Sequence, residues 1–138
     1  MDVQNALAFA REQRRSVLVT MKRDGHPQLS NVLHVIGDDG TIRVSITATR
    51  AKYHNLVRTP WAAMHITSGD FWRYAVLECD VELSAVAAAP DDATVDALVD
   101  YYRRATGEHD DWDGYRAAMV RDQRVIARLH PTRAYGSV

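Results

Sequence analysis

The sequence predicts a mainly β, α+β fold in which an antiparallel sheet closes into a barrel and helices pack outside it. Between Ser16 and Ser84, short segments of alternating apolar and polar residues recur, separated by turn signals. A helical insert and a final strand follow them. Because hairpin-linked strands lack the βαβ alternation of parallel sheets, the pattern favours a six-stranded antiparallel barrel.

A short first helix opens the chain, and Asp2 can cap it. The next stretch, SVLVTMKRDGHPQLSNVLHVIGDDGTIRVSIT, is typical of three strands joined by two turns. Asp24-Gly25 and Asp39-Gly40 predict these turns, because glycine accepts a positive φ at no steric cost. The first three strands are therefore expected between Ser16 and Thr47.

A second short helix is predicted from Arg50 to Val57, ending before Pro60. WAAMHIT (Trp61 to Thr67) is the fourth strand. FWRYAVLECDVELS is the fifth, a long strand with one core face and one polar face.

Two helices precede the sixth strand. Asp91 or Asp92 can cap the first of them, and Gly107 ends it. The second runs from about Asp113 to Asp122. RVIARLHPTRAYG then closes the chain as a strand, in which Pro131 predicts an edge position or a bulge.

Composition limits what the chain can be. Its 138 residues predict one domain, residues 1–138. A net charge of −1 gives no overall field that would attract nucleic acid or a membrane, so an anion site must be local. The single cysteine cannot form an internal disulfide, no apolar run is long enough to span a bilayer, and we expect a cytoplasmic protein.

Several kinds of chemistry lack their sequence signals. The 6 histidines form no His-x-His or H-E-x-x-H pattern, and the chain has no cysteine pair, so no metal site is predicted. A G-x-S-x-G elbow, a P-loop and a G-x-G-x-x-G turn are also missing. Any redox chemistry is therefore expected to belong to a bound cofactor.

Arg50 and Lys52 stand where the third strand gives way to the second helix. They could be ordinary surface cations. However, a helix N-terminus already favours anions, and cations there are unfavourable unless something negative is bound. Thr47 and Thr49 add hydroxyl donors. A phosphate or polyanionic tail is the natural ligand.

Polar residues also interrupt the second and third strands. Gln28 and Ser30 share one face of their strand, and Asn31 lies on the other. They could satisfy backbone groups, or, beside Ser45 and Thr47 on the next strand, they could bind the edge of a heterocycle.

Trp72 and Tyr74 share one face of the fifth strand. They could form a core pair, or with equal fit a stacking surface or part of a dimer interface. His34 and His65 are read as core histidines, with contact to a bound ring as the alternative.

Read together, these segments resemble the pyridoxamine 5′-phosphate oxidase-like split-barrel flavoproteins, and more narrowly the actinobacterial branch that uses coenzyme F420, a deazaflavin. The turn and strand D-G-x-P-x-x-S-N, the segment R-A-K-x-x-N-L and the helix pair around GEHDDWDGYRAAM carry the resemblance. It covers most of the chain beyond the first helix.

The resemblance implies a six-stranded split β-barrel that forms a homodimer with two cofactor sites at its interface. It assigns the ring to the strand Gln28 to Val32 and to Ser45 and Ile46. It places the cofactor phosphate at Arg50, Ala51 and Lys52. It also implies that Trp72 and Tyr74 of the partner subunit contribute to the site.

The expected function is hydride transfer between reduced F420 and a small unsaturated organic substrate. Related users of flavin mononucleotide (FMN) often carry an arginine and a lysine on the strand matching Ser30 to Val35, where this chain has Ser30, Asn31 and His34. An FMN-dependent, pyridoxamine 5′-phosphate oxidase-like enzyme and a non-catalytic F420 carrier are the alternatives.

Overall fold

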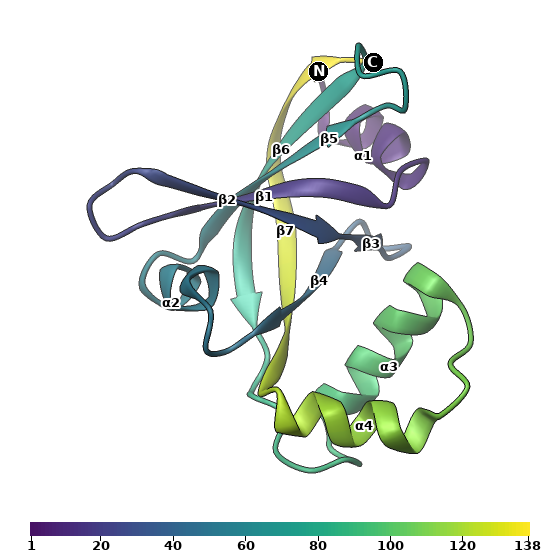
Figure 1. Cartoon of the computed structure of the whole chain (residues 1–138). Helices are drawn as coiled ribbons and strands as arrows, with labels where there is room; N and C mark the ends of the chain where they lie inside the picture. Colours follow the sequence, from purple (N-terminus) through teal and green to yellow (C-terminus); the bar gives the residue numbers. More distant parts are fainter.

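The computed structural model describes residues 1–138, which form an α+β fold of seven strands and four helices (Figure 1). The strands are β1 (Arg15–Met21), β2 (Pro27–Leu33), β3 (Val35–Ile36), β4 (Ile42–Thr47), β5 (Trp61–Thr67), β6 (Tyr74–Leu83) and β7 (Arg124–Ser137). The helices are α1 (Val3–Arg11), α2 (Ala51–Arg58), α3 (Ala93–Thr106) and α4 (Trp112–Arg121).

All strands belong to one antiparallel sheet, in the order β2-β1-β5-β6-β7-β4-β3. The two strands at its ends, β2 and β3, follow one another in the chain. The sheet therefore curls back on itself into a half-barrel, as the long crossing strands in Figure 1 show.

The prediction of six strands is wrong by one, because the second predicted strand breaks at His34. Residues before it pair with β1, and residues after it pair with β4. The His34 ring is buried and is hydrogen-bonded on both sides, 2.9 Å from Ser16 Oγ and 2.9 Å from the Ala10 carbonyl oxygen. These two bonds hold the corner where the chain passes from one end of the sheet to the other.

Three aspartates cap helices as their spacing allows. Asp2 accepts from the backbone N–H of Asn5 at the start of α1, and Asp92, not Asp91, caps α3. Asp111 caps α4, so that helix begins at Trp112, one residue before the predicted start. Gly107 ends α3 with a φ of 103°.

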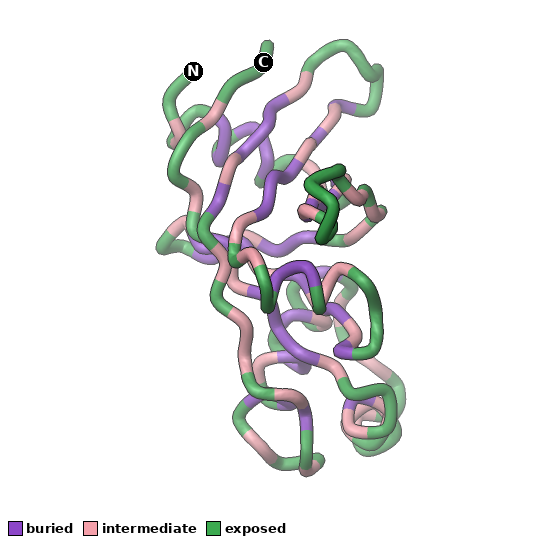
Figure 2. Tube along the Cα trace, turned by 90° about the vertical axis from the view of Figure 1, so that its left-hand side faces the viewer, coloured by how far each residue is buried: buried purple, intermediate pink, exposed green.

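Two apolar clusters make the core. The larger fills the half-barrel and includes the inner face of α1 together with alternate residues of the strands. The smaller lies beneath α3 and α4. Figure 2 shows the alternation of buried and less buried residues along the strands. In α3, Tyr101 is buried and donates its hydroxyl to the Leu33 carbonyl oxygen, whereas the neighbouring Tyr102 is half-buried.

The prediction of an irregularity at Pro131 is confirmed. Cys79 pairs with Pro131 and Glu78 pairs with Arg133, so Thr132 is an extra residue in β7, which is a bulge. Pairing of β7 with β4 ends at Leu129, before the proline. None of the four helices is both long and apolar enough to cross a membrane.

Candidate functional site

A pocket of about 430 Å³ lies where β2, β7 and the connection from β4 to α2 meet. Its lining combines three cations, three polar side chains and one alanine: Gln28, Ser30, Thr47, Arg50, Ala51, Lys52 and Arg124. The sequence analysis singled out the first six. The structure brings them together and adds Arg124.

The N-terminus of α2 forms one wall of this pocket. Arg50 is the N-cap residue, and its side chain makes no capping hydrogen bond. No acidic residue stands in the first turn of the helix. The free N–H groups and the positive dipole end therefore add to the charges of Arg50 and Lys52.

Arg124 is the first residue of β7 and lies opposite Thr47 in the ladder between β4 and β7. Its Nη1 donates to Ser45 Oγ at 3.4 Å, a long bond. Its Nε is buried and has no hydrogen-bond partner, the one such side-chain atom in the structure. Buried polar groups are normally paired, so this unpaired donor is an exception in the structure.

The charges around the pocket also favour a bound anion. Burial lowers the pKa of Lys52 below its ordinary value, and the charges of Arg124 and Arg50 lower it further. No carboxylate lines the pocket to balance these cations. An anion bound there would relieve the repulsion between the cations and would accept hydrogen bonds from them.

The segment R-A-K-x-x-N-L also positions a polar residue. Asn55, buried on the inner side of α2, donates from Nδ2 to Gln28 Oε1 at 2.7 Å and to Thr20 Oγ1 at 3.2 Å. Its Oδ1 accepts from Arg58 Nη2 at 3.0 Å. These bonds occupy the Gln28 carbonyl oxygen and leave its amide group as the free hydrogen-bonding end in the pocket.

Six predicted site residues lie outside this pocket: Asn31, Ser45, Ile46, Thr49, Trp72 and Tyr74. Ile46 is fully buried in the core, so its side chain cannot line the pocket. Ser45 lies beneath Arg124 as its hydrogen-bond acceptor. Thr49 is exposed and is not among the lining residues, and Asn31 faces a different pocket.

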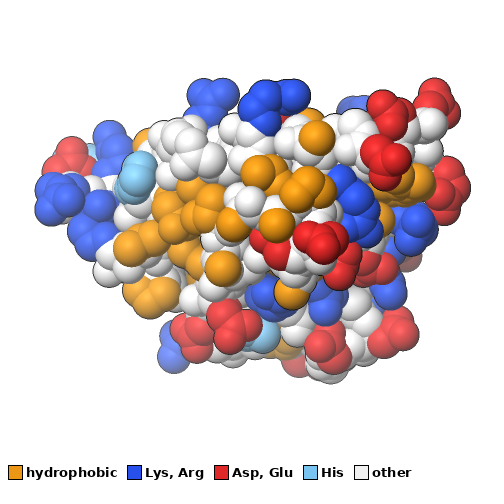
Figure 3. Space-filling view, turned by 90° about the horizontal axis from the view of Figure 1, so that it is seen from below, with side chains coloured by type: hydrophobic (Ala, Val, Ile, Leu, Met, Phe, Trp, Pro, Cys, Tyr) orange, Lys and Arg blue, Asp and Glu red, His pale blue; other side chains and the backbone are white.

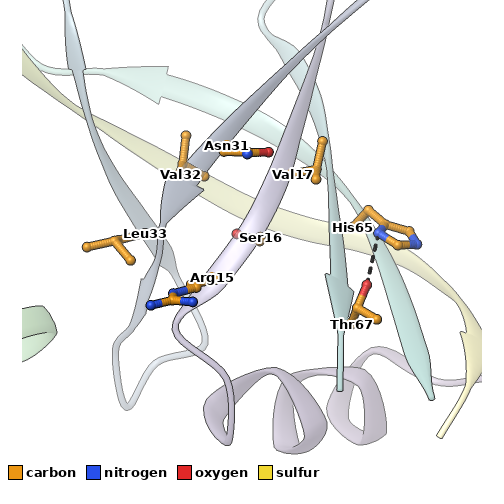
Figure 4. Close-up of a pocket in the computed structure, with 8 residues that line it drawn as sticks. All are labelled: Arg15, Ser16, Val17, Asn31, Val32, Leu33, His65 and Thr67. Atoms are coloured by element: carbon orange, nitrogen blue, oxygen red, sulfur yellow. Dashed lines mark hydrogen bonds between the residues drawn. The ribbon is translucent and has the colours of Figure 1, made fainter. Parts of the chain in front are cut away.

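That second pocket, of about 480 Å³, lies where β1 and β5 separate (Figure 4). The two strands pair only from Val17 to Val19, so their ends diverge and leave a fork. The side chains around it are Arg15, Ser16, Val17, Asn31, Val32, Leu33, His65 and Thr67. Its mixture of apolar and polar groups suits a small organic molecule better than a phosphate.

Trp72 and Tyr74 lie at a third pocket, of about 260 Å³, together with Phe71 and His65. The rings of His65 and Tyr74 stack with their centroids 5.5 Å apart. His65 borders both this pocket and the fork, so it joins the two. Trp72 is 78% exposed, and therefore is not the core residue that one interpretation of the sequence allowed.

Charge is unevenly distributed over the surface despite its near-zero total. Seen from below, apolar side chains gather on the left half of the molecule, with basic side chains at the left end and clusters of acidic ones at the right end (Figure 3). No group of three or more histidine, cysteine, aspartate or glutamate side chains is placed to hold a metal ion.

Comparison with protein families places the chain in a known family. The model of the family described as pyridoxamine 5′-phosphate oxidase matches residues 3–137, almost the whole chain.

Several solved structures share the fold. A conserved hypothetical protein from Mycobacterium tuberculosis is 23% identical, with a TM-score of 0.76 over 99% of this chain and 84% of that one. A structure named F420 reductase is 25% identical, with a TM-score of 0.68 over 92% of this chain and 94% of that one. The heme storage protein HutZ from Vibrio cholerae is 14% identical, with a TM-score of 0.71 over 99% and 96%.

Proposed function

Because this chain belongs to the pyridoxamine 5′-phosphate oxidase family, we propose that it is an oxidoreductase dependent on coenzyme F420. Its reaction is hydride transfer between the reduced coenzyme and a small unsaturated organic substrate. The similarity to the structure named F420 reductase, over more than nine tenths of both chains, supports this choice of cofactor.

One observation carries the proposal: the pocket is lined by three cations, Arg50, Lys52 and Arg124, and by no carboxylate. One of these residues, Arg124, also has a buried Nε without a hydrogen-bond partner. Such a pocket fits the acidic part of a redox cofactor. In this proposal the three cations hold the phosphodiester and the acidic tail of F420. Gln28 and Ser30, on the same face of β2, bind the polar edge of the ring.

Bound there, the deazaflavin would supply the hydride. The residues of this chain would fix its position and orientation, which can contribute a large part of a rate enhancement. The neighbouring fork lined by Asn31 and His65 is the proposed place for the substrate, because it is the larger and less charged pocket.

FMN is the second candidate, and Arg124 is the observation that favours it. A phosphate monoester carries up to about two negative charges at neutral pH, and a third cation is well suited to balance them. An FMN-dependent enzyme would use the same pocket. A non-catalytic F420 carrier would also use it, but would have no need of the fork beside it.

We further propose a homodimer formed through the outer face of the half-barrel. A row of opposed residues crosses this face from strand to strand: Asn31, Val17, His65, Val76 and Tyr135. Leu29 on β2 is 63% exposed, and Phe71 and Trp72 extend the apolar surface beyond β5. A second copy of the chain would cover these apolar groups and bring its Trp72 and Tyr74 to the cofactor.

The test is a pair of fluorescence titrations with F420 and with FMN, on the wild-type protein and on Lys52→Ala. Lys22→Ala, on the exposed hairpin, is the matched control. We expect F420 to bind more tightly than FMN, and Lys52→Ala alone to weaken it. Tighter binding of FMN than of F420 would identify FMN as the cofactor. If neither molecule gave a saturable titration, the proposal would be refuted.

Turnover separates an enzyme from a carrier. Reduced F420 is mixed with the protein and a set of enones and quinones, and its oxidation is followed by absorbance. Oxidation that requires both protein and substrate supports the enzyme. Tight binding without turnover of any of these substrates would favour the carrier.

A further inference from the structure

A separate basic pocket of about 250 Å³ lies on another part of the molecule, between the end of α1, strand β3 and the end of α3. In Figure 1 the upper end of α3 reaches this region beside β3. Its lining residues are Arg11, Gln13, Arg14, His34, Val35, Ile36, Arg104 and Ala105. None of them belongs to the pocket of Arg50 and Lys52.

Three arginines from three segments meet in this pocket, and the backbone fixes two of them. Arg11 Nη2 donates to the Gly37 carbonyl oxygen at 2.9 Å, and Arg14 Nη1 donates to the Ala105 carbonyl oxygen at 2.8 Å. Arg104 pairs through Nε with Asp100 Oδ2 at 3.0 Å. Each guanidinium is therefore held in place by a single nitrogen.

The remaining donors have no protein partner. A guanidinium has five N–H groups, and each of these arginines uses one nitrogen in the bonds described. No carboxylate lines the pocket, and Asp100, outside it, balances one of the three charges. In a chain whose net charge is −1, this is a local excess of positive charge.

Holding the end of a helix explains part of this arrangement. Arg14 reaches a carbonyl in the last turn of α3, which is a normal place for a cation. That role needs one arginine and one N–H group. It does not account for three guanidinium groups around one pocket with most of their donors free.

We propose that Arg11, Arg14 and Arg104 form a second anion site, which takes a phosphate group, either free or carried by a small molecule. Guanidinium forks match the oxygens of phosphate, and arginines already held in place lose less side-chain entropy on binding. Since a water molecule occupies about 30 Å³ in the liquid, the pocket has room for a phosphate and a few further atoms. The site does not depend on the proposed function.

The His34 ring gives a reporter for this pocket, because it lines this pocket and not the pocket of Arg50 and Lys52. The experiment follows the ring signals of His34 by NMR during a titration with inorganic phosphate, at constant ionic strength and pH. It uses the Lys52→Ala protein to weaken binding at the other cationic pocket. We expect the His34 signals to shift and saturate.

Two variants and one control decide the outcome. Arg14→Gln and Arg104→Gln should each weaken the response of His34 at least tenfold. Arg104→Gln serves if Arg14→Gln fails to fold, because Arg104 holds no backbone carbonyl in the structure. Arg116→Gln is the matched control, since Arg116 also donates to a carbonyl, that of Pro90, and also pairs with an aspartate. Its response should equal that of the parent.

Glycerol 2-phosphate and potassium chloride complete the test. A response to glycerol 2-phosphate stronger than that to phosphate identifies an ester as the ligand, and the reverse identifies the free ion. An equal response to chloride, an unsaturated shift, or equal affinities in Arg14→Gln, Arg104→Gln and Arg116→Gln would overturn the proposal.

Discussion

Thr47 and Arg124 face each other in the ladder between β4 and β7, although 76 positions separate them in the sequence (124 − 47 − 1). This pairing places the Arg124 guanidinium beside the start of α2, where Arg50 and Lys52 are found. The cationic pocket is therefore completed by a residue from the far end of the chain.

Replacement of Arg124 tests the pocket most directly. Arg124→Gln should weaken cofactor binding by about 1.5–3 kcal/mol, the range for a hydrogen bond to a charged group. It should leave the free energy of unfolding unchanged or raise it, because the native Nε lacks a partner and the charge of Arg124 opposes that of Lys52. Fluorescence titration and urea unfolding measure the two effects.

Arg121→Gln is the control for Arg124, since Arg121 is exposed and pairs only with its neighbour Asp122. If Arg124→Gln instead destabilised the protein and left cofactor affinity unchanged, its role would be structural.

Lys52 predicts a pH dependence of cofactor binding. Its pKa is lowered by burial and by the charges of Arg124 and Arg50. Because the anion binds to the charged form, affinity should fall as pH rises through this lowered pKa, below the ordinary value of 10.5. Removal of a neighbouring cation should move the fall to higher pH.

Lys52→Ala should lose about 1.5–3 kcal/mol of binding free energy at neutral pH, and its affinity should no longer show this fall. Titrations of wild type and variant at a series of pH values check both points. A fall that persists unchanged in Lys52→Ala would show that another group titrates.

Asn55 is predicted to support both stability and the position of Gln28. Asn55→Ala removes hydrogen bonds to Gln28, Thr20 and Arg58 in a residue that is 6% exposed. The unfolding free energy should fall by about 1–3 kcal/mol, the cost of leaving buried polar groups unpaired. Val57→Ala, at an exposed position of the same helix, should change it by less than about 0.5 kcal/mol. If the two substitutions lowered the unfolding free energy equally, Asn55 would not have this role.

His34 should make stability depend on pH. Burial lowers its pKa below the ordinary value of 6.5, although its backbone hydrogen bonds act in the opposite direction. Just below pH 6.5 the unfolded chain therefore binds more protons than the folded one. The stabilising contribution is complete above pH 6.5 and is lost as pH falls toward the lowered pKa, with a slope of at most about 1.4 kcal/mol per pH unit.

Urea unfolding at several pH values measures this slope. His34→Gln should be less stable than wild type and should show a smaller slope between pH 5 and 6.5, roughly the range over which a histidine titrates. His54→Gln, an exposed histidine on α2, should keep the wild-type slope. An unchanged slope in His34→Gln would contradict the assignment.

The proposed dimer is tested by a charge placed on the uncovered face. Leu29→Glu should reduce the molecular mass measured by light scattering from that of two chains toward that of one, because a buried unpaired carboxylate is costly. Val57→Glu is the matched control, since Val57 is 59% exposed and Leu29 is 63% exposed, but Val57 lies on α2. A wild-type protein with the mass of a single chain would refute the dimer.

Local pattern was sufficient to predict most of the elements. Asp2, Asp92 and Gly107 bound helices where their cap preferences place them, and Trp61 to Thr67 is a strand with the predicted limits. The strand count failed at His34, because no residue there breaks a strand by its own preference. The break arises from bonds to Ser16 and Ala10, which the folded chain alone brings near.

The candidate site divides in the same way. Arg50, Ala51 and Lys52 could be found because a helix N-terminus is recognisable from its neighbours in sequence. Arg124 carried no signal of its own, since an arginine at the start of a strand is common and unremarkable. Its place in the pocket follows from the register of β7 against β4, which sequence periodicity does not specify.

The sequence by itself determined most of the strands, the helices, most of their caps and the cations at the start of α2, because these depend on residues a few positions apart. Tertiary structure alone decided that β2 and β3 lie at opposite ends of one sheet, that Arg124 joins Lys52, and that three arginines surround a second pocket. Those relations arise from packing between distant segments, where many arrangements satisfy the same local preferences and burial of the shared core selects one.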